Sequence, residues 1–170
     1  MKPFIKREEV RMIDISIPIG GGRFNFRVGV VLLHRERVLL HKQENDDYWA
    51  LPGGRVAVFE QTKQTAIREM KEELGIAIGV DRPLWITENF FTYTNESFHE
   101  IAVYYQGSMR LENTLYKGDQ AFVGQESDRA LIYQWIPIER VQSVYLRPKF
   151  LQKCLQQLPT SPEFLVIKDD

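Results

Sequence analysis

Residues 54–76 read GRVAVFEQTKQTAIREMKEELGI, and the second half of this segment has the pattern of an amphipathic helix. At about 100° per residue, its apolar side chains fall on one stripe: Ala66, Ile67, Met70 and Leu74. Gly75 follows the last of them, and glycine is a common residue just beyond a helix C-terminus. We therefore predict a helix from about Gln61 to Leu74 that packs this stripe against the core.

Glu69, Glu72 and Glu73 lie at i, i+3 and i+4 of this helix, so their carboxylates share an arc of about 100° beside the apolar stripe. Like charges at this spacing repel one another, and the helix macrodipole disfavours anions in the last turns. Arg68 reaches Glu72 at i+4, but in the weaker order for an ion pair. Because the cluster is unfavourable by itself, it indicates a site for a hard divalent cation with oxygen ligands.

The spacing of Gly54, Glu60 and the segment 68–76 resembles the Nudix box at every position that the motif specifies. A wider resemblance runs from about Phe24 to Arg140 and includes the sequence WALPGG at 49–54. It implies an α/β fold, specifically an α/β/α sandwich with a mixed β-sheet. Phe59 departs from the box, which often has glycine there; we expect an altered entry to the helix and a ring that could line the substrate site.

The resemblance also implies a reaction, the metal-dependent hydrolysis of a phosphoanhydride bond in a nucleoside diphosphate-linked substrate, with Mg²⁺ or Mn²⁺ as cofactor. It assigns the metal ligands to Glu69, Glu72 and Glu73, with the backbone carbonyl of Gly53 as a further ligand. Either Glu69 or Glu72 could instead accept the proton of the attacking water. Arg68 is expected to orient a carboxylate, such as that of Glu60.

Later acidic residues are further candidates for the catalytic base or an additional ligand. Glu126 lies about where some family members carry such a residue, although an ordinary acidic loop residue explains it equally well. His99 and Glu100 form another candidate pair, for which we favour a structural explanation.

The substrate is less well defined by the sequence. Arg27, Lys42 and Arg55 are candidate phosphate contacts, and Tyr93 is a candidate for stacking on a base. The leading substrates are a nucleoside triphosphate or a dinucleoside polyphosphate, and the alternatives are ADP-ribose or a nucleotide sugar. A module that senses a nucleotide without turnover is a third possibility, which the complete set of box carboxylates disfavours.

Composition and length narrow the class of protein. With 170 residues, 44% of them apolar and 26% charged, the chain is expected to form a single Nudix domain over 1–170, with an N-terminal strand and turn in 1–22 and a C-terminal helix and tail in 146–170. A net charge of −1 argues against a broad nucleic-acid surface or attraction to a membrane, so the expected partner is a small nucleotide. A homodimer is left open. The single Cys154 excludes an internal disulfide and suits the cytoplasm.

The remaining hydrophobic patterns predict strands separated by turns, and then two helices. The expected strands are 10–19, 24–33, 38–42, 83–92, 98–105 and 130–136, with a last strand or loose tail at 164–167. We expect a loop at 113–128, a short helix from about Ile138, and a C-terminal helix from Leu146 to Leu158.

Overall fold

The computed structural model describes residues 12–109, 115–125 and 130–169. A mixed sheet of eight strands forms the centre, in the order β6-β7-β3-β2-β5-β4-β8, with β1 paired to β2 beside this path. The strands are β1 (Ser16–Ile19), β2 (Gly22–His34), β3 (Arg37–Gln43), β4 (Ile78–Tyr93), β5 (Glu96–Met109), β6 (Phe122–Val123), β7 (Leu131–Pro137) and β8 (Glu163–Asp169). The helices are α1 (Thr62–Leu74), the 3₁₀ helix η1 (Ile138–Ser143) and α2 (Phe150–Cys154).

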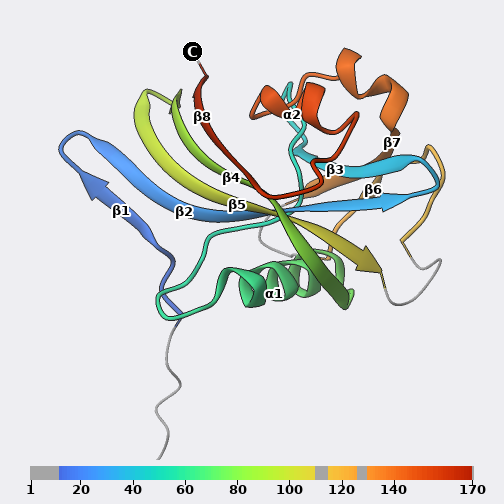
Figure 1. Cartoon of the computed structure of the whole chain (residues 1–170), viewed down its shortest axis with the longest axis horizontal. Helices are drawn as coiled ribbons and strands as arrows, with labels where there is room; N and C mark the ends of the chain where they lie inside the picture. The colour runs from blue at the N-terminus through green and yellow to red at the C-terminus, as the bar shows by residue number, and fades with distance from the viewer. Residues whose placement is uncertain (1–11, 110–114, 126–129, 170) are drawn as a thin grey trace, which may run out of the picture.

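The sheet lies between two layers of helix. Figure 1 shows α1 below the sheet, and α2 with the neighbouring 3₁₀ helix above it. Two separate hydrophobic clusters fill the two interfaces, one built around α1 and one around α2 and η1. The predicted α/β/α sandwich is therefore confirmed.

Strand β2 lies at the centre of both interfaces. Its alternating side chains Val28 and Val30 belong to the cluster on the α1 side, whereas Val31 belongs to the cluster on the α2 side. On one edge β2 pairs in parallel with β5, and on the other its last residues pair with β3. A strand buried on both faces needs a nearly continuous apolar run, which explains the sequence of residues 28–32, whereas Leu33 is exposed.

Tight turns join three antiparallel strand pairs. Residues 35–36 connect β2 to β3 and residues 94–95 connect β4 to β5, and all four have a positive φ of 47–64°. Gly20 and Gly21 take the same role between β1 and β2, with φ of 53° and 88°. Two-residue turns with positive φ match the twist of antiparallel strands, so each of these turns fixes the register of the strand pair that it joins.

The C-terminal region differs from its prediction. The expected helix from Leu146 to Leu158 is wrong in extent, because α2 covers only Phe150–Cys154. Pro148 explains the late start: it has no N–H to donate, and it disfavours helical backbone at the preceding residue.

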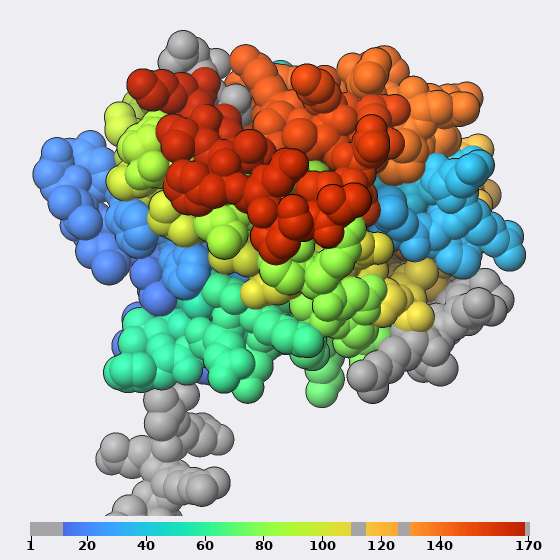
Figure 2. Space-filling model, viewed as in Figure 1, coloured from blue at the N-terminus to red at the C-terminus, as the bar shows by residue number. Residues whose placement is uncertain are grey.

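Beyond α2, the segment first described as a strand or a loose tail is strand β8. It runs parallel to β4, with Trp85 opposite Glu163 and Phe91 opposite Asp169. Figure 2 shows the C-terminal residues, in red, lying across the front of the molecule over β4. The tail prediction is therefore wrong and the edge-strand prediction is confirmed.

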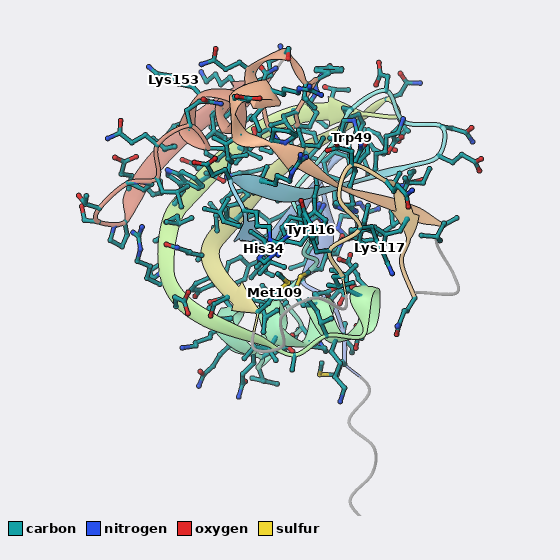
Figure 3. All side chains as sticks on the ribbon, turned by 90° about the vertical axis from the view of Figure 1, so that its right-hand side faces the viewer. His34, Trp49, Met109, Tyr116, Lys117 and Lys153 are labelled. Atoms are coloured by element: carbon teal, nitrogen blue, oxygen red, sulfur yellow. The ribbon has the colours of Figure 1, made fainter. Side chains whose placement is uncertain are left out.

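The described part of the predicted loop at 113–128 contains β6 and is anchored to β7. The Trp135 indole N–H donates to the carbonyl of Leu115 over 3.1 Å, and the Tyr116 ring lies against His34 with centroids 4.9 Å apart. Figure 3 shows Tyr116 and His34 side by side. Within the described residues, no helix is long and apolar enough to cross a membrane.

Candidate active site

Helix α1 forms as predicted, but its buried face is rotated slightly from the expected stripe. Ala66, Met70 and Leu74 are buried, as expected. The prediction for Ile67 is wrong, because 38% of this residue is exposed. The sheet instead contacts the side of the helix that carries Thr65 and Glu73, which are both buried. The helix ends as expected at Gly75, which has a left-handed conformation with φ of 68°.

The three glutamates of α1 experience different surroundings. Glu73 is 4% exposed, the side chain of Glu69 is 15% exposed, and that of Glu72 is 53% exposed. Among the residues that the structure describes, no three His, Cys, Asp or Glu side chains converge into a ready-made cation site. The helical spacing thus brings the carboxylates to one end of α1, but in this structure they do not close on a common point.

Arg68 holds two of the three glutamates of α1. Its guanidinium donates to both carboxylate oxygens of Glu60 at 2.9 Å, to Glu69 Oε1 at 2.8 Å and to Glu72 Oε2 at 3.0 Å. The hydrogen bonds from Arg68 hold the pKa of Glu60 below its usual value. Arg68 therefore orients carboxylates, and it draws those of Glu69 and Glu72 toward its own guanidinium.

The segment before the helix brings two glycines against the sheet. The Val28 N–H donates to the Gly54 carbonyl over 2.9 Å, and the Val30 N–H donates to the Pro52 carbonyl over 2.8 Å. A Cβ on Gly53, where φ is 147°, would lie 2.2 Å from the Val28 carbonyl oxygen. A Cβ on Gly54 would lie 2.1 Å from the carboxyl carbon of Glu69. Backbone atoms exclude a side chain at Gly53, whereas the missing side chain at Gly54 lets the Glu69 carboxylate reach the backbone.

A pocket of about 520 Å³ opens beside this segment and spans several elements. Its lining includes six of the residues singled out in the sequence: Arg27, Lys42, Gly53, Glu73, Tyr93 and Glu100. Aromatic side chains line other parts of its wall: Tyr48, Phe91 and Tyr145. One cavity thus joins the end of the acidic helix to cationic and aromatic groups.

Arg27 is the central cation of the pocket. Burial by itself lowers its pKa, but the carboxylates of Glu100 and Glu73 outweigh this effect and raise the pKa overall. Burial in turn raises the pKa of Glu100, and Arg27 opposes that rise. Glu100 also accepts a hydrogen bond from Asn25 Nδ2 over 3.5 Å. These carboxylates hold a charged guanidinium where phosphate oxygens would be attracted.

Lys42 and Tyr93 lie nearer to the loop that follows β3. Lys42 Nζ donates to the carbonyl of Asp46 over 3.1 Å and lies 5.6 Å from the centre of the Trp49 ring. Tyr93 is 42% exposed and lies close to Tyr48, whose pKa is raised chiefly by burial and also by Asp46 and Tyr93. Both predicted contacts therefore have access to a ligand in the pocket.

Other candidate residues lie outside the pocket lining. The carbonyl of Arg55 accepts a hydrogen bond from Arg68 over 3.2 Å. His99 is 3.0 Å from Glu88 Oε1 and stacks on Phe90, which agrees with a structural role, whereas its neighbour Glu100 lines the pocket. Phe59 is fully exposed, so it does not line the pocket. Glu126 lies outside the described residues.

The pocket residues that were missed from the sequence include His41 and Asn89. His41 Nε2 lies 3.1 Å from the Leu51 carbonyl, so this nitrogen carries the hydrogen and Nδ1 is an acceptor. Burial and the charge of Arg27 lower the pKa of His41 to about 4, so the ring is neutral at pH 7. Asn89 is 4% exposed. A single histidine or asparagine in a strand has no sequence signal that distinguishes a pocket residue from a core residue.

Comparisons with known proteins agree on the fold. The MutT protein from Methanosarcina mazei Go1 shares 21% identity over 78% of this chain and 91% of that chain, with a TM-score of 0.57. MutT NUDIX hydrolase from Burkholderia pseudomallei shares 23% identity over 79% and 97% of the two chains, with a TM-score of 0.55. A UDP-X diphosphatase shares 20% identity over 83% and 66%, with a TM-score of 0.56. None of the curated proteins matches the chain.

The family is shown by sequence. A family model described as the NUDIX domain matches residues 23–158, which is well over half of the 170 residues. The match contains β2 from Arg23 onward, the glycine segment, α1 and all of the described pocket lining. The chain therefore belongs to the Nudix hydrolase family.

Proposed function

We propose that this protein hydrolyses a phosphoanhydride bond of a nucleotide, most readily a nucleoside triphosphate or a dinucleoside polyphosphate, with Mg²⁺ or Mn²⁺ as cofactor. The observation that carries the proposal is the composition of one pocket. Gly53 and Glu73, two of the expected metal ligands, line the same cavity as Arg27 and Lys42. A cavity that combines carboxylates with cationic groups suits a metal-bound phosphate chain.

The residues present fit a divalent cation that prefers oxygen ligands. Glu69 has its carboxylate packed against the backbone of Gly54, where a Cβ would lie 2.1 Å from the carboxyl carbon. This contact places a helix carboxylate beside the peptide that carries the Gly53 carbonyl. We propose that Glu69, Glu72, Glu73 and the Gly53 carbonyl hold the cation, which when bound polarises phosphoryl oxygens and activates a water molecule.

The remaining residues have distinct roles in this proposal. Arg68 positions Glu69 and Glu72, as its hydrogen bonds at 2.8 and 3.0 Å indicate. Arg27 attracts the phosphate chain, and Lys42 adds a second positive charge. A carboxylate accepts the proton of the attacking water, and Glu69, Glu72 and Glu126 are the candidates. Arg55 is kept as a phosphate contact from outside the pocket lining, and Tyr93 as a stacking partner of the base.

A panel of substrates tests both the reaction and the substrate class. Formation of the nucleotide products would be measured by chromatography with Mg²⁺, with Mn²⁺ and with EDTA. The panel contains normal and oxidised nucleoside triphosphates, diadenosine polyphosphates, ADP-ribose and nucleotide sugars; UDP-linked compounds are included because a structurally similar protein is named UDP-X diphosphatase. We expect metal-dependent turnover that is highest for the triphosphates or diadenosine polyphosphates.

Two results would change the proposal. Higher turnover of ADP-ribose or a nucleotide sugar would keep the chemistry and replace the substrate class. If no substrate of the panel is hydrolysed while nucleotides still raise the melting temperature, the hydrolase proposal is wrong and a nucleotide-sensing module is supported.

A further inference from the structure

Asn89 lies on the floor of the pocket with an unsatisfied acceptor. It belongs to β4, lines the cavity and is 4% exposed. Its side-chain oxygen Oδ1 is buried and has no hydrogen-bond partner among the described residues. Burying a carbonyl oxygen without a donor destabilises the folded protein, so most buried oxygens of this kind are satisfied. Asn89 Oδ1 is one of several buried atoms without a partner among the described residues, and it belongs to a residue of the pocket wall, where a ligand can supply the donor.

The neighbours of Asn89 explain why the protein itself does not satisfy this oxygen. In the sheet, Asn89 lies opposite Glu100, which in turn lies opposite Asn25 on β2. Ionised Glu100 can only accept hydrogen bonds. Asn25 Nδ2 donates to Glu100, and the charge of Arg27 is directed to the same carboxylate. The donors on these neighbouring strands are therefore directed at Glu100 and not at Asn89.

The wall around Asn89 is suited to a flat ring. Phe91 and Tyr93 follow Asn89 at every second position of β4, so all three side chains share one face of the strand, and all three line the pocket. Tyr48 and Tyr145 line the same cavity from two loops. Aromatic rings stack on nucleobases, while a buried amide reads the edge of the base.

We propose that Asn89 determines which nucleobase is bound, by accepting through Oδ1 a hydrogen bond from an N–H group of the base. The inference rests on the proposed function, because it takes the ligand to be a nucleotide. Phosphate groups do not suit this oxygen, since they are negatively charged acceptors themselves. In this proposal Asn89 contacts the nucleobase, and Arg27 contacts the phosphate chain.

Binding without metal tests the assignment independently of turnover. Calorimetry on the full chain in EDTA would compare AMP, GMP, CMP and UMP with ribose 5-phosphate, which has the sugar and phosphate but no base. Wild type should bind at least one nucleotide about tenfold more tightly than ribose 5-phosphate. Asn89→Leu should abolish this advantage and leave the affinity for ribose 5-phosphate unchanged.

Two further variants complete the design. Asn89→Thr keeps an acceptor oxygen without placing a charge beside Glu100, and it should retain a preference for the base, which also covers the case in which the leucine variant does not fold. Asn45→Leu introduces the same change at an exposed position outside the pocket lining and should bind as wild type does. The melting temperature of Asn89→Leu should not fall, because its lost oxygen has no partner in the free protein.

Several outcomes would overturn the inference. Equal weakening of nucleotide and ribose 5-phosphate binding by Asn89→Leu would assign the contact to the sugar. Unchanged nucleotide binding would remove Asn89 from the site, and so would equal wild-type affinities for the nucleotides and ribose 5-phosphate.

Turnover of the nucleotide panel, measured in parallel, separates this inference from the proposed function. Base-dependent binding that Asn89→Leu abolishes, without turnover, would reject the hydrolase and retain the base contact. Turnover by wild type, together with unchanged nucleotide binding by Asn89→Leu, would retain the hydrolase and reject the base contact.

Discussion

The site has an acidic wall on α1 and a polar floor on the sheet, and the two are built differently. In the wall, Arg68 binds Glu60, Glu69 and Glu72, which all lie within eight residues of it. In the floor, Asn25 and Glu100 are 75 residues apart and meet only because β2 pairs with β5. The wall depends on one helix and its preceding loop, whereas the floor depends on the register of three strands.

This difference separates two kinds of residue, those that a short segment positions and those that the whole sheet positions. Variants in the wall should affect chemistry with little loss of stability, provided that they avoid the core face of α1. Changes in the floor should affect stability, ligand choice or both. The following experiments test that distinction.

The largest effect is expected at the core face of α1. Met70 is fully buried, so Met70→Lys should lower the free energy of unfolding by about 4 kcal/mol or more, because it buries an unpaired charge and loses packing. Ile67→Lys is the matched control on the same helix, and it should change the free energy of unfolding by less than about 1 kcal/mol. Urea unfolding measures both. Equal losses for the two variants would contradict the observed orientation of the helix.

The next effect concerns the wall itself. Glu72→Gln should lower kcat by about two to three orders of magnitude, because it removes a proposed metal ligand. Its melting temperature should stay within a few degrees of wild type, since the side chain is 53% exposed. Glu139→Gln, at an exposed position on η1, serves as the control and should retain activity. Near wild-type turnover of Glu72→Gln would remove this residue from the reaction.

In the floor, His41 should make stability depend on pH. Its pKa is lowered from 6.5 to about 4 by burial and by Arg27, so between these values the unfolded chain binds a proton that the folded protein does not. The free energy of unfolding is therefore not reduced by His41 above pH 6.5. It falls by up to about 3 kcal/mol as the pH is lowered to 4.

Urea unfolding at several pH values would measure this dependence. His41→Gln should show a smaller loss between pH 6.5 and 4 than wild type, whereas His99→Gln, in which the replaced side chain is 44% exposed, should resemble wild type. The assignment fails if wild type and His41→Gln lose the same free energy.

The smallest expected effect is at the glycine beside the wall. A Cβ on Gly54 meets only the end of the Glu69 side chain, so Gly54→Ala should displace this carboxylate while the backbone stays in place. We expect kcat to fall about 10- to 100-fold, and the melting temperature to change little. Gly79→Ala is the control, because its Cβ would also meet a side-chain end, the hydroxyl of Ser108, away from the pocket. An unstable Gly54→Ala with normal specific activity would contradict the positioning role.

The same comparison explains what the sequence could predict. The helix, its end at Gly75 and the pairing of Arg68 with Glu60 follow from spacings of eight residues or fewer, and the structure contains all three. Ile67 was misplaced because an apolar stripe defines a broad arc, and packing selects one side of it. Asn89 and His41 could not be found, since their place in the pocket depends on strand register and not on local spacing. The C-terminal helix was overestimated because apolar spacing alone carries no information about Pro148.

Strand β8 lies beyond residue 158, where the family match ends, yet it pairs with β4 along seven residues. It covers an edge that would otherwise offer a long row of free N–H and carbonyl groups to another molecule. A chain trimmed at the family boundary would keep every described residue of the pocket lining, but it would expose β4 to strand exchange and aggregation. The C-terminal residues thus protect the domain from aggregation, although they do not line its pocket.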